Sequence, residues 1–289
     1  MNIAITGKGS YIGICIKKHL EKAGFVVDEI DTIGNEWKET DFSKYDTVVH
    51  VAAIVHDNAK NATEDLFKRV NIDLACDIAE KAKHQGVGQF VFISTMAVFG
   101  VEKTLNRDEG IVFADSPLNP SSLYGKSKLE AEKKLLAREN DNFRISIVRP
   151  PNVYGPGCKG NYVYLLKKLS DAMFICPYAY EETRQSMLYI DNLSELIKLI
   201  IENSSSGVFM PQDDVAPNMV ELVASIRAIS GKKTRYSKLL GKCLKIMAKL
   251  SIVKKIYGGV CYENSFSNSF DYKYRIVTFD EGLKKTYNK

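Results

Sequence analysis

The sequence has few of the residues that build metal sites, and its cysteines form no recognisable pairs. Its 289 residues include four histidines and six cysteines, all scattered and with no Cys-x-x-Cys pair. This pattern excludes a zinc signature and disfavours a disulfide framework. The first residues, Met-Asn-Ile-Ala-Ile, are typical of a strand and not of a signal peptide. Thiols without an export signal predict a cytoplasmic protein, and no metal site is expected.

Long apolar runs and a strong charge of one sign are missing as well. No stretch of about 18 uncharged apolar residues exists, so no transmembrane segment is predicted. The 40 basic and 35 acidic residues leave a net charge of +5, which does not require a nucleic-acid partner. With 45% hydrophobic and 26% charged residues, the composition is that of a globular protein.

Short apolar runs alternate with amphipathic helical patterns through the first half of the chain. The predicted strands cover residues 3–6, 25–30, 45–51, 90–94 and 145–149, and the predicted helices cover 12–23, 64–85 and 122–139. Strands and helices that alternate at this spacing are typical of parallel βαβ units with helices on both faces. The prediction is an α/β fold built on a doubly wound parallel sheet.

After residue 150 the alternation becomes less regular. Helices are predicted at 161–171, 191–203 and 218–230. The change in pattern predicts a smaller C-terminal α/β lobe over residues 151–289, partly interleaved with the first half of the chain.

A glycine-rich turn over residues 6–13, Thr-Gly-Lys-Gly-Ser-Tyr-Ile-Gly, follows the first predicted strand. Such glycines let the backbone turn tightly and let amides approach a diphosphate at a helix N-terminus. Asp31 ends the second predicted strand, where a carboxylate accepts a hydrogen bond from a ribose 2′-hydroxyl. The same carboxylate repels a 2′-phosphate, so NAD is predicted rather than NADP. Residues 1–150 are therefore predicted to form a Rossmann-type dinucleotide-binding domain.

A threonine, a tyrosine and a lysine form a candidate catalytic trio. Tyr124 and Lys128 lie four residues apart, so they share one face of a predicted helix. A free tyrosine, with a pKa of about 10, is a poor base, but nearby positive charge stabilises its phenolate. Thr95 follows a predicted strand at the ligand-binding edge of the sheet. The spacing alone also fits an exposed Tyr/Lys pair, but the preceding glycine turn and Asp31 favour proton transfer by Tyr124.

These motifs, in this order, resemble the extended short-chain dehydrogenase/reductase family, and within it the NAD-dependent nucleotide-sugar epimerases and reductases such as UDP-hexose 4-epimerases. The resemblance covers residues 1 to about 200. The matching segments are ITGKGSYIG (5–13), Asp31, VVHVAA (48–53), FISTMAVFG (92–100), YGKSK (124–128), RPPNVYGPG (149–157) and RQSMLYIDNLSE (184–195).

The resemblance implies a role for each matching residue. Thr95, Tyr124 and Lys128 are implied to be catalytic, and the family suggests a homodimer formed through the helix that carries Tyr124. The implied NAD contacts are Gly7, Gly9, Tyr11, Ile12, Gly13, Asp31, Asp41, Phe42 (with Asp41 beside the adenine), Ala52, Ala53, Asn71, Tyr124 and Lys128. The implied substrate contacts are Thr95, Tyr124, Asn152, and, at the diphosphate, Asn161 and Arg184, whose guanidinium suits phosphate oxygens.

The chain also departs from the family pattern. Ser10 stands where the family has its second glycine of the turn, and this position requires a compatible backbone conformation. Phe99 replaces a tyrosine, and the chain is shorter than typical members. Met96 and Ala97 follow Thr95, and neither ionises, whereas family members that act as 4,6-dehydratases carry an acidic pair there. A dehydratase is therefore not predicted.

Two reactions fit the trio, because both move a hydride at carbon and a proton at oxygen. The first is 4-epimerisation of a nucleotide sugar for surface polysaccharide, with the hydride from C4 passing to NAD and the proton to Tyr124. The alternative is NAD(P)H-dependent reduction of a 4-keto-6-deoxy-(N-acetyl)hexose nucleotide. The segments 149–161 and 184–193 most resemble enzymes of N-acetylhexosamine nucleotides. A third hypothesis, from another class, is a non-catalytic dinucleotide sensor.

Residues 238–255 repeat lysines at helical spacing among apolar residues, which is typical of a basic amphipathic helix. The favoured interpretation is an ordinary helix of the C-terminal lobe, with lysines in solvent and apolar residues buried. The alternative is peripheral contact with an anionic membrane or a lipid-linked sugar diphosphate. Residues 261–275 have no assigned element, and covering the substrate is a role open to them.

Overall fold

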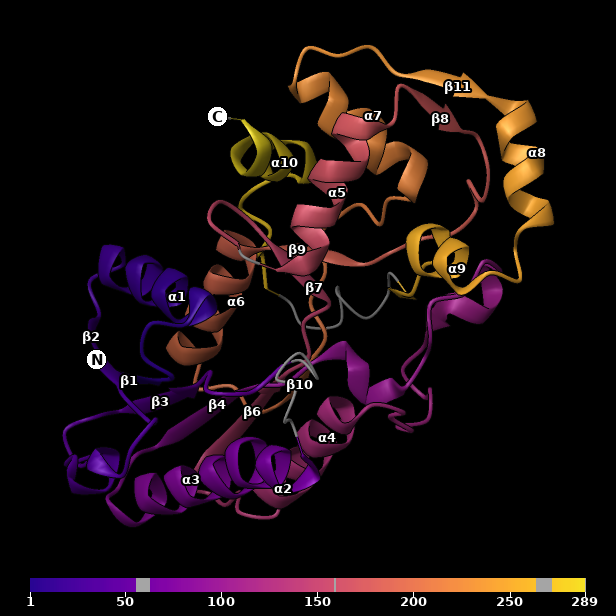
Figure 1. Ribbon diagram of the computed structural model, residues 1–289. Coiled ribbons are helices and arrows are strands. Elements are labelled where there is room, and N and C mark those ends of the chain that lie inside the picture. The colour runs from indigo at the N-terminus through magenta and orange to yellow at the C-terminus, as the bar shows by residue number, and fades with distance from the viewer. Residues whose placement is uncertain (56–62, 159, 264–271, 289) are drawn as a thin grey trace.

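A six-stranded sheet, parallel throughout, forms the centre of the molecule (Figure 1). The computed structural model describes residues 1–55, 63–158, 160–263 and 272–288. The strand order is β10-β6-β4-β3-β1-β2. The strands are β1 (Asn2–Thr6), β2 (Val26–Ile30), β3 (Thr47–His50), β4 (Gln89–Ile93), β6 (Arg144–Val148) and β10 (Gly207–Phe209). The predicted α/β fold with a Rossmann-type sheet is confirmed.

Helices cover both faces of this sheet. One face packs against α1 (Tyr11–Lys22) and α6 (Ile190–Glu202), and the other against α3 (Leu74–His84) and α4 (Leu123–Leu136). Alternate residues of β1 divide between the two layers: Ile3 and Ile5 pack with α1 and α6, while Ala4 packs with α3 and α4. Strands buried on both faces are mostly apolar, which explains why the sequence showed several of them as short apolar runs.

The helix predicted over 64–85 is present but not regular. It begins as α2 (Glu64–Phe67), widens into the π-helical segment η2 (Lys68–Asp73) and continues as α3. A π-helical turn adds a residue to the helix and is frequent at functional sites. The widened turn contains Asn71, which is fully buried.

The second half of the chain contributes to both parts of the molecule. α6 and β10 complete the central layers, while α5 (Asn161–Ala172), α7 (Met219–Ile229) and α10 (Phe279–Tyr287) form the second lobe (Figure 1). Three two-stranded sheets surround these elements. They pair β7 (Asn152–Tyr154) with β9 (Met187–Tyr189), β8 (Ile175–Pro177) with β11 (Arg235–Ser237), and β5 (Ile111–Val112) with β12 (Cys261–Tyr262). Short 3-10 turns are η1 (Glu36–Glu39), η3 (Met96–Phe99) and η4 (Asp108–Gly110).

The favoured interpretation of residues 238–255, one helix with a buried apolar face, is wrong. The segment forms two helices, α8 (Lys238–Ile246) and α9 (Ser251–Tyr257). In α8 the one buried residue is Gly241, where a Cβ would lie 2.1 Å from the carbonyl oxygen of Tyr178. The apolar residues of α8 are mostly in solvent, and Ile246 is 84% exposed.

Residues 261–275 are described only in part. Cys261 and Tyr262 form β12, and Tyr274 is buried, with its hydroxyl donating to the carbonyl oxygen of Gln212 at 2.6 Å. Residues 264–271 lie outside the described residues, so a covering role for this segment stays a prediction. Across the described ranges, no helix has the length and apolar character needed to cross a membrane.

A buried carboxylate joins the central sheet to the second lobe. Asp213 follows β10 and accepts hydrogen bonds from the Tyr154 hydroxyl at 2.8 Å, the Asn192 amide at 2.9 Å and the Tyr189 backbone N–H at 3.0 Å. These partners belong to β7, α6 and β9. Burial raises the pKa of Asp213 to about 6, although the three donors oppose that shift.

Replacing this carboxylate tests how much the junction contributes to stability. The Asp213→Ala substitution leaves several buried donors without their acceptor, and we expect the free energy of unfolding to fall by about 3 kcal/mol. Urea denaturation followed by circular dichroism measures the loss. The neighbouring Asp214 is exposed, so Asp214→Ala should change stability by less than about 0.5 kcal/mol. Equal effects of the two substitutions would contradict the assigned role.

The raised pKa also predicts a pH dependence. Because the folded-state pKa of Asp213 is about 6 and the ordinary value is 3.8, the protonated carboxyl contributes stability that is complete below pH 3.8. That contribution is lost as the pH rises through about 6. The free energy of unfolding of wild type relative to Asp213→Asn should therefore fall over this interval. A difference that is constant with pH would show that the carboxyl is not perturbed.

Candidate active site

Three segments with predicted roles meet at the carboxyl edge of the sheet. β1 lies between β2 and β3 in the sheet, so the chain adds strands first on one side of β1 and then on the other. Open α/β sheets bind ligands at such a switch point. The register pairs Thr6 with His50, and His50 with Phe92. Gly7, Ala52 and Thr95 follow β1, β3 and β4 at this edge, so the sheet brings the glycine turn and the threonine of the predicted trio together.

The glycine turn depends on two residues with a positive φ. Gly7 has a φ of 85°, and a Cβ there would lie 2.9 Å from the backbone N and Cα of Ala52. Gly9 has a φ of 77°, but nothing lies within 4 Å of its Cβ position. Gly7 is therefore required by close packing against the chain after β3, whereas Gly9 is required by its backbone conformation alone.

Ser10 replaces the expected glycine without strain. Its φ is −70°, which any residue adopts, and its Oγ accepts a hydrogen bond from the Gly13 N–H at 3.2 Å as the N-cap of α1. A Cβ at Gly13 would lie 2.7 Å from that Oγ. The first turn of α1 carries no acidic residue, so this helix N-terminus suits an anion.

Tyr11 and Ile12, the first residues of α1, are both half-buried. Ile12 packs against the core that α1 shares with the sheet. Tyr11 reaches the second lobe, because a Cβ at Gly155 would lie 2.6 Å from its hydroxyl oxygen. Tyr11 is thus a contact between the glycine turn and the Tyr-Gly-Pro-Gly segment.

Two carboxylates lie at the end of β2. Asp31 is exposed, and its Oδ1 accepts a hydrogen bond from the Ile33 N–H at 2.9 Å. Glu29, which the sequence analysis missed, accepts one from the Gly9 N–H at 3.2 Å. The clue was its position two residues before Asp31, on the same strand. Two acidic groups beside the glycine turn disfavour a 2′-phosphate more strongly than Asp31 alone.

The segment implied to lie beside the adenine is divided between surface and core. Asp41 is exposed and accepts hydrogen bonds from the backbone N–H of Ser43 at 2.9 Å and its hydroxyl at 2.7 Å, which lower the pKa of Asp41. Phe42 is fully buried, and its N–H donates to the Gln85 Oε1 at 2.6 Å. The Phe42 side chain therefore belongs to the core, and only Asp41 faces solvent.

Asn71 connects the chain after β3 to α4. Its Oδ1 accepts a hydrogen bond from the Ile54 N–H at 2.9 Å, and its Nδ2 donates to the Ile54 carbonyl oxygen at 3.1 Å and the Ser127 Oγ at 2.9 Å. Ala52 is buried and Ala53 is half-buried in the segment that Asn71 holds. The buried amide thus supports both the predicted NAD cleft and the helix that carries Tyr124.

The predicted trio meets at the end of β4. Thr95 lies close enough to Tyr124 for its side chain to lower the pKa of the tyrosine hydroxyl. The Lys128 Nζ donates to the carbonyl oxygen of Ile93 at 2.8 Å and lies 4.3 Å from the centre of the Phe92 ring. α4, which carries Tyr124 and Lys128, lies directly against η3, which follows Thr95. This contact brings the three residues together although they are distant in the sequence.

A glycine inside the tyrosine motif allows this approach. A Cβ at Gly125 would lie 2.7 Å from the carbonyl oxygen of Ala97 and 2.8 Å from the Cβ of Pro120. No role for Gly125 was predicted from the sequence, although a glycine within a helix is itself a signal of close packing.

Burial shifts the pKa of both titratable members of the trio in the direction that favours the uncharged form. It raises the pKa of Tyr124 to about 12, and the neighbouring Thr95 side chain opposes this shift. It lowers the pKa of Lys128 to about 7, and the charge of Glu132 opposes that shift. At neutral pH Tyr124 retains its proton, so a phenolate forms there only when additional positive charge is present.

A buried ion pair lies below the trio and was missed by the sequence analysis. The Arg149 Nη2 lies 2.6 Å from the Glu132 Oε2, and the Ser94 hydroxyl donates to the same carboxylate. Arg149 also lies 5.2 Å from the Phe99 ring, and its carbonyl oxygen accepts from the Tyr262 hydroxyl at 2.8 Å. Glu132 follows Lys128 by one helical turn, which was the available signal. The pair fixes the end of β4 to α4 and β6.

The three implied substrate residues outside the trio are spread over the second lobe. Asn152 begins β7 and is exposed, while Arg184 is half-buried and donates to the carbonyl oxygens of Glu181 at 2.6 Å and Thr183 at 2.9 Å. Asn161 begins α5, and its side chain lies outside the described residues. Their roles toward a substrate stay predictions.

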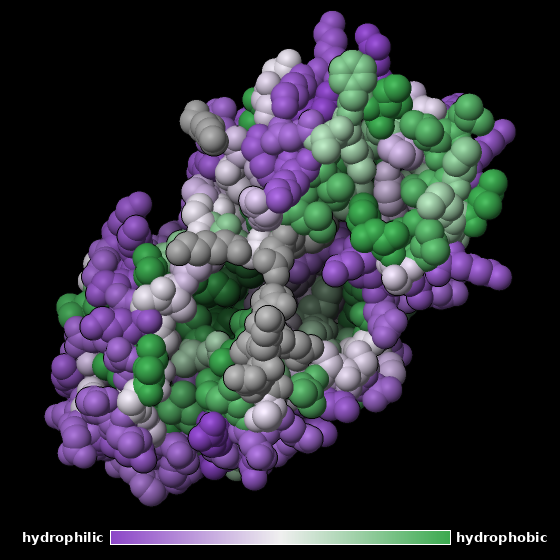
Figure 2. Space-filling model, viewed as in Figure 1, coloured by the Kyte–Doolittle hydropathy of each residue, from purple (hydrophilic) through white to green (hydrophobic). Residues whose placement is uncertain are grey.

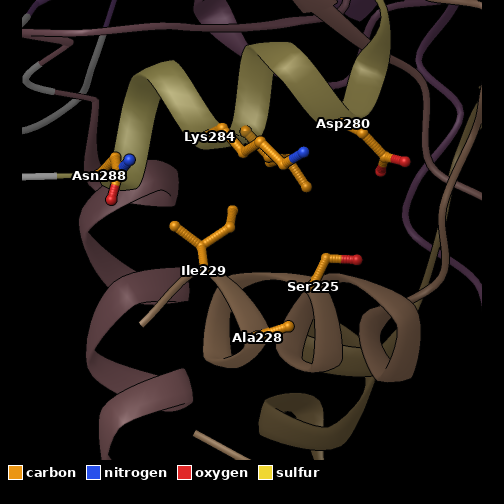
Figure 3. A pocket seen from close by; sticks show the side chains of 7 residues that line it. Ser225, Ala228, Ile229, Asp280, Lys284 and Asn288 are labelled. Carbon is orange, nitrogen blue, oxygen red and sulfur yellow. The ribbon is translucent and has the colours of Figure 1, made fainter. Parts of the chain in front are cut away.

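Figure 3 shows a pocket between α7 and α10 that contains none of the predicted site residues. It lies in the part of the second lobe remote from α4 (Figure 1). Ser225 of α7 and Asp280 and Lys284 of α10 line it (Figure 3). This pocket is therefore separate from the candidate active site. The face in Figure 2 is instead hollowed between the two halves of the molecule.

A glycine turn at the switch point of a parallel sheet, beside a threonine, a tyrosine and a lysine, defines a dinucleotide-dependent enzyme of the short-chain dehydrogenase/reductase type. The chain belongs to the NAD dependent epimerase/dehydratase family, whose model matches residues 3–209. Family membership confirms the predicted extended short-chain dehydrogenase/reductase class and the predicted cofactor, NAD.

Similar proteins include epimerases. A UDP-glucose 4-epimerase of Vibrio cholerae is 28% identical over 99% of this chain and 94% of its own length. An N-acetyl-alpha-D-glucosaminyl-diphospho-ditrans,octacis-undecaprenol 4-epimerase of Escherichia coli O157:H7 is 30% identical over 72% of this chain and 63% of its own. The solved structure of a UDP-glucuronic acid 4-epimerase from Bacillus cereus with NAD shares the fold, with a TM-score of 0.73, 22% identity, and coverage of 99% and 95%.

Alanine substitutions at two glycines with similar positive φ values distinguish a loss of NAD binding from a loss of stability caused by backbone strain alone. Gly7 and Gly24 have φ values of 85° and 89°, but only at Gly7 does a Cβ meet other atoms. We expect Gly7→Ala to reduce NAD affinity at least about tenfold, because the turn must move away from Ala52. Gly24→Ala should cost about 1 kcal/mol of stability and leave NAD affinity unchanged. Calorimetric titration with NAD measures both, and equal affinities would contradict the role of Gly7.

Proposed function

We propose that this protein is an NAD-dependent 4-epimerase of a nucleotide sugar, of the UDP-hexose or UDP-N-acetylhexosamine type, used for surface polysaccharide. The observation that carries the proposal is the meeting of Thr95, Tyr124 and Lys128 at the edge that also holds the glycine turn. The similarity to a UDP-glucose 4-epimerase over 99% of the chain supports the same reaction.

The residues at this edge fit NAD. The turn at Gly7 and Gly9 leads into a capped helix N-terminus without acidic residues, which suits the diphosphate. The carboxylates of Glu29 and Asp31 suit a ribose with free hydroxyls. When bound, NAD would supply the hydride acceptor and, once reduced, the hydride donor that inversion at C4 of the sugar requires. This cycle consumes no cofactor.

The chain's own residues manage the proton. Tyr124 receives the proton of the C4 hydroxyl as the sugar is oxidised, and returns it to the same oxygen afterwards. Thr95 hydrogen-bonds that oxygen and the tyrosine. The Lys128 ammonium and the positive charge of the oxidised nicotinamide together lower the pKa of Tyr124 from its buried value of about 12. Lys128 also holds the nicotinamide ribose.

The remaining assignments belong to the same proposal. Asn152 contacts the sugar nucleotide, and Asn161 and Arg184 bind its diphosphate in the lobe formed mainly by residues 151–289. Residues 1–150 hold NAD, the enzyme acts in the cytoplasm, and it forms a homodimer through α4. Support for the lobe comes from β7 and β9, because Tyr154 and Tyr189 of these strands bond to Asp213, which follows β10 of the central sheet.

A second candidate substrate is a sugar diphosphate linked to a lipid. The relative from Escherichia coli O157:H7 is a 4-epimerase of such a compound, as its name states. The exposed apolar residues of α8 favour this candidate, because a soluble substrate gives no reason to expose them.

The 4-ketoreductase alternative uses the same trio and differs in its cofactor balance. A reductase consumes NAD(P)H in proportion to product, whereas an epimerase turns over without net change in NADH absorbance. The complete trio disfavours the third hypothesis, a non-catalytic sensor, since a sensor does not need a proton-transfer group.

Substitution of the tyrosine tests the proposed mechanism. We expect Tyr124→Phe to lower kcat for UDP-hexose epimerisation by at least about 100-fold, with NAD still bound, because the proton acceptor is lost and the packing is kept. Coupled assays of product sugar measure kcat, and mass spectrometry of the native protein measures bound NAD. Tyr236→Phe on β11, where the side chain is 52% exposed, is the matched control. Unchanged turnover in Tyr124→Phe would refute the proposal.

A further inference from the structure

The C-terminal half contains a long stretch of one charge sign. Between Glu221 and Glu263 the sequence has no aspartate or glutamate. Its basic residues are Arg227, Lys232, Lys233, Arg235, Lys238, Lys242, Lys245, Lys249, Lys254 and Lys255. The whole chain has a net charge of only +5, so the remainder is net acidic. The positive charge of this protein is therefore concentrated on β11, α8 and α9.

Apolar side chains are exposed on the same helices. Along α8, Leu239 is 71% exposed and Ile246 is 84% exposed, and Cys243 between them is also exposed. Their spacing of four and three residues forms one stripe on the helix. Leu250 and Ile252 extend the exposed apolar surface into α9, at 47% and 54%. A helix of a soluble lobe normally turns such a stripe inward.

The elements beside α8 enlarge this surface with aromatic residues. α8 packs against β8, which pairs with β11. Phe174 is 69% exposed, and the rings of Tyr178 and Tyr236 lie 6.0 Å apart in an edge-to-face pair at the surface. Figure 2 shows hydrophobic residues gathered over this part of the second lobe, with hydrophilic residues around them. We call this surface the apolar face: Phe174, Ile175, Tyr178, Tyr236, Leu239, Leu240, Ile246, Met247, Leu250 and Ile252.

We propose that the apolar face docks on an anionic lipid bilayer. Aromatic and aliphatic side chains enter the boundary between headgroups and acyl chains, and the lysines of α8 and α9 pair with lipid phosphates. The complementary charge selects this partner, because the basic stretch contains no acidic residue to balance it.

A second copy of this chain does not satisfy the same surface. Pairing two apolar faces would bring the lysines of one copy against those of the other, and like charges at an interface are unfavourable. Lys242, Lys245 and Lys249 are all exposed around the apolar residues. A symmetric contact would therefore bury lysines of like charge close to one another.

Docking would bring the membrane close to the predicted diphosphate site. α9 ends at Tyr257, whose carbonyl oxygen accepts from the Thr183 hydroxyl at 3.0 Å. A Cβ at Gly259 would lie 2.1 Å from the carbonyl oxygen of Arg184. The chain that leaves the apolar face therefore packs directly against the arginine assigned to the substrate. Access to a lipid-linked sugar diphosphate rests on the proposed function, whereas the docking itself does not.

Co-sedimentation of the full-length protein with vesicles tests the docking. Vesicles of phosphatidylcholine with phosphatidylglycerol should bind the protein, vesicles of phosphatidylcholine alone should bind it more weakly, and added salt should release it. The triple substitution K242E/K245E/K249E should weaken binding roughly 100-fold or more. The control is K22E/K126E/K133E, which makes the same charge change at exposed positions elsewhere and should bind as wild type does.

A second variant tests the apolar part. Leu239→Ser with Ile246→Ser keeps every lysine and should also weaken vesicle binding, while the far-ultraviolet circular dichroism stays native. The proposal is overturned if wild type does not bind anionic vesicles, or if both sets of charge variants bind equally. It is also overturned if sedimentation shows a dimer that the serine variant dissociates.

Turnover of soluble UDP-hexoses separates this proposal from the proposed function. The α8 variants should retain wild-type turnover of soluble substrate, since they lie outside the trio and the glycine turn. Binding to anionic vesicles without any UDP-hexose turnover would refute the proposed soluble substrate and support docking. Turnover without vesicle binding would refute docking and support the proposed function.

Discussion

The close approach of the glycine turn to the chain after β3 is the constraint on which the site depends. Gly7 lies so near the backbone of Ala52 that no side chain fits between them. This contact sets the edge of the sheet at the switch point, where β1 separates the two directions of winding. The end of β4 then places Thr95 beside α4, and the candidate chemistry is located between these two segments.

Buried polar groups hold this edge in place from below. Asn71 ties Ile54 to Ser127, and the Glu132–Arg149 pair ties the ends of β4 and β6 to α4. A buried ion pair is costly to break, because removing one member leaves the other charged and desolvated. These groups therefore fix the position of the helix that carries Tyr124 and Lys128. Burial at this site also raises the pKa of Tyr124 and lowers the pKa of Lys128, so it favours the uncharged form of both side chains.

The second lobe is well packed where it meets the sheet but exposes apolar side chains on its outer surface. An apolar core continuous with that of the sheet joins it to the rest of the molecule, and the buried carboxylate of Asp213 lies within this junction. Its outer surface on α8, in contrast, leaves apolar side chains in solvent. Gly241 explains how both occur together: the backbone of α8 packs tightly against Tyr178 through a residue without a side chain. The larger residues of α8 are consequently directed outward, and the lysines between them provide the charge that a bilayer would attract.

Local patterns in the sequence determined the strands, most helices, the glycine turn and the Tyr-x-x-x-Lys spacing, because each depends on neighbours a few residues apart. Tertiary structure alone decided what depends on distant segments. Phe42 is buried in the core, and Glu29 accepts a hydrogen bond from the Gly9 N–H. Arg149, after β6, forms an ion pair with Glu132 of α4. The amphipathic pattern of residues 238–255 could not show which face would be covered, since exposure depends on what packs against a helix and not on its own periodicity.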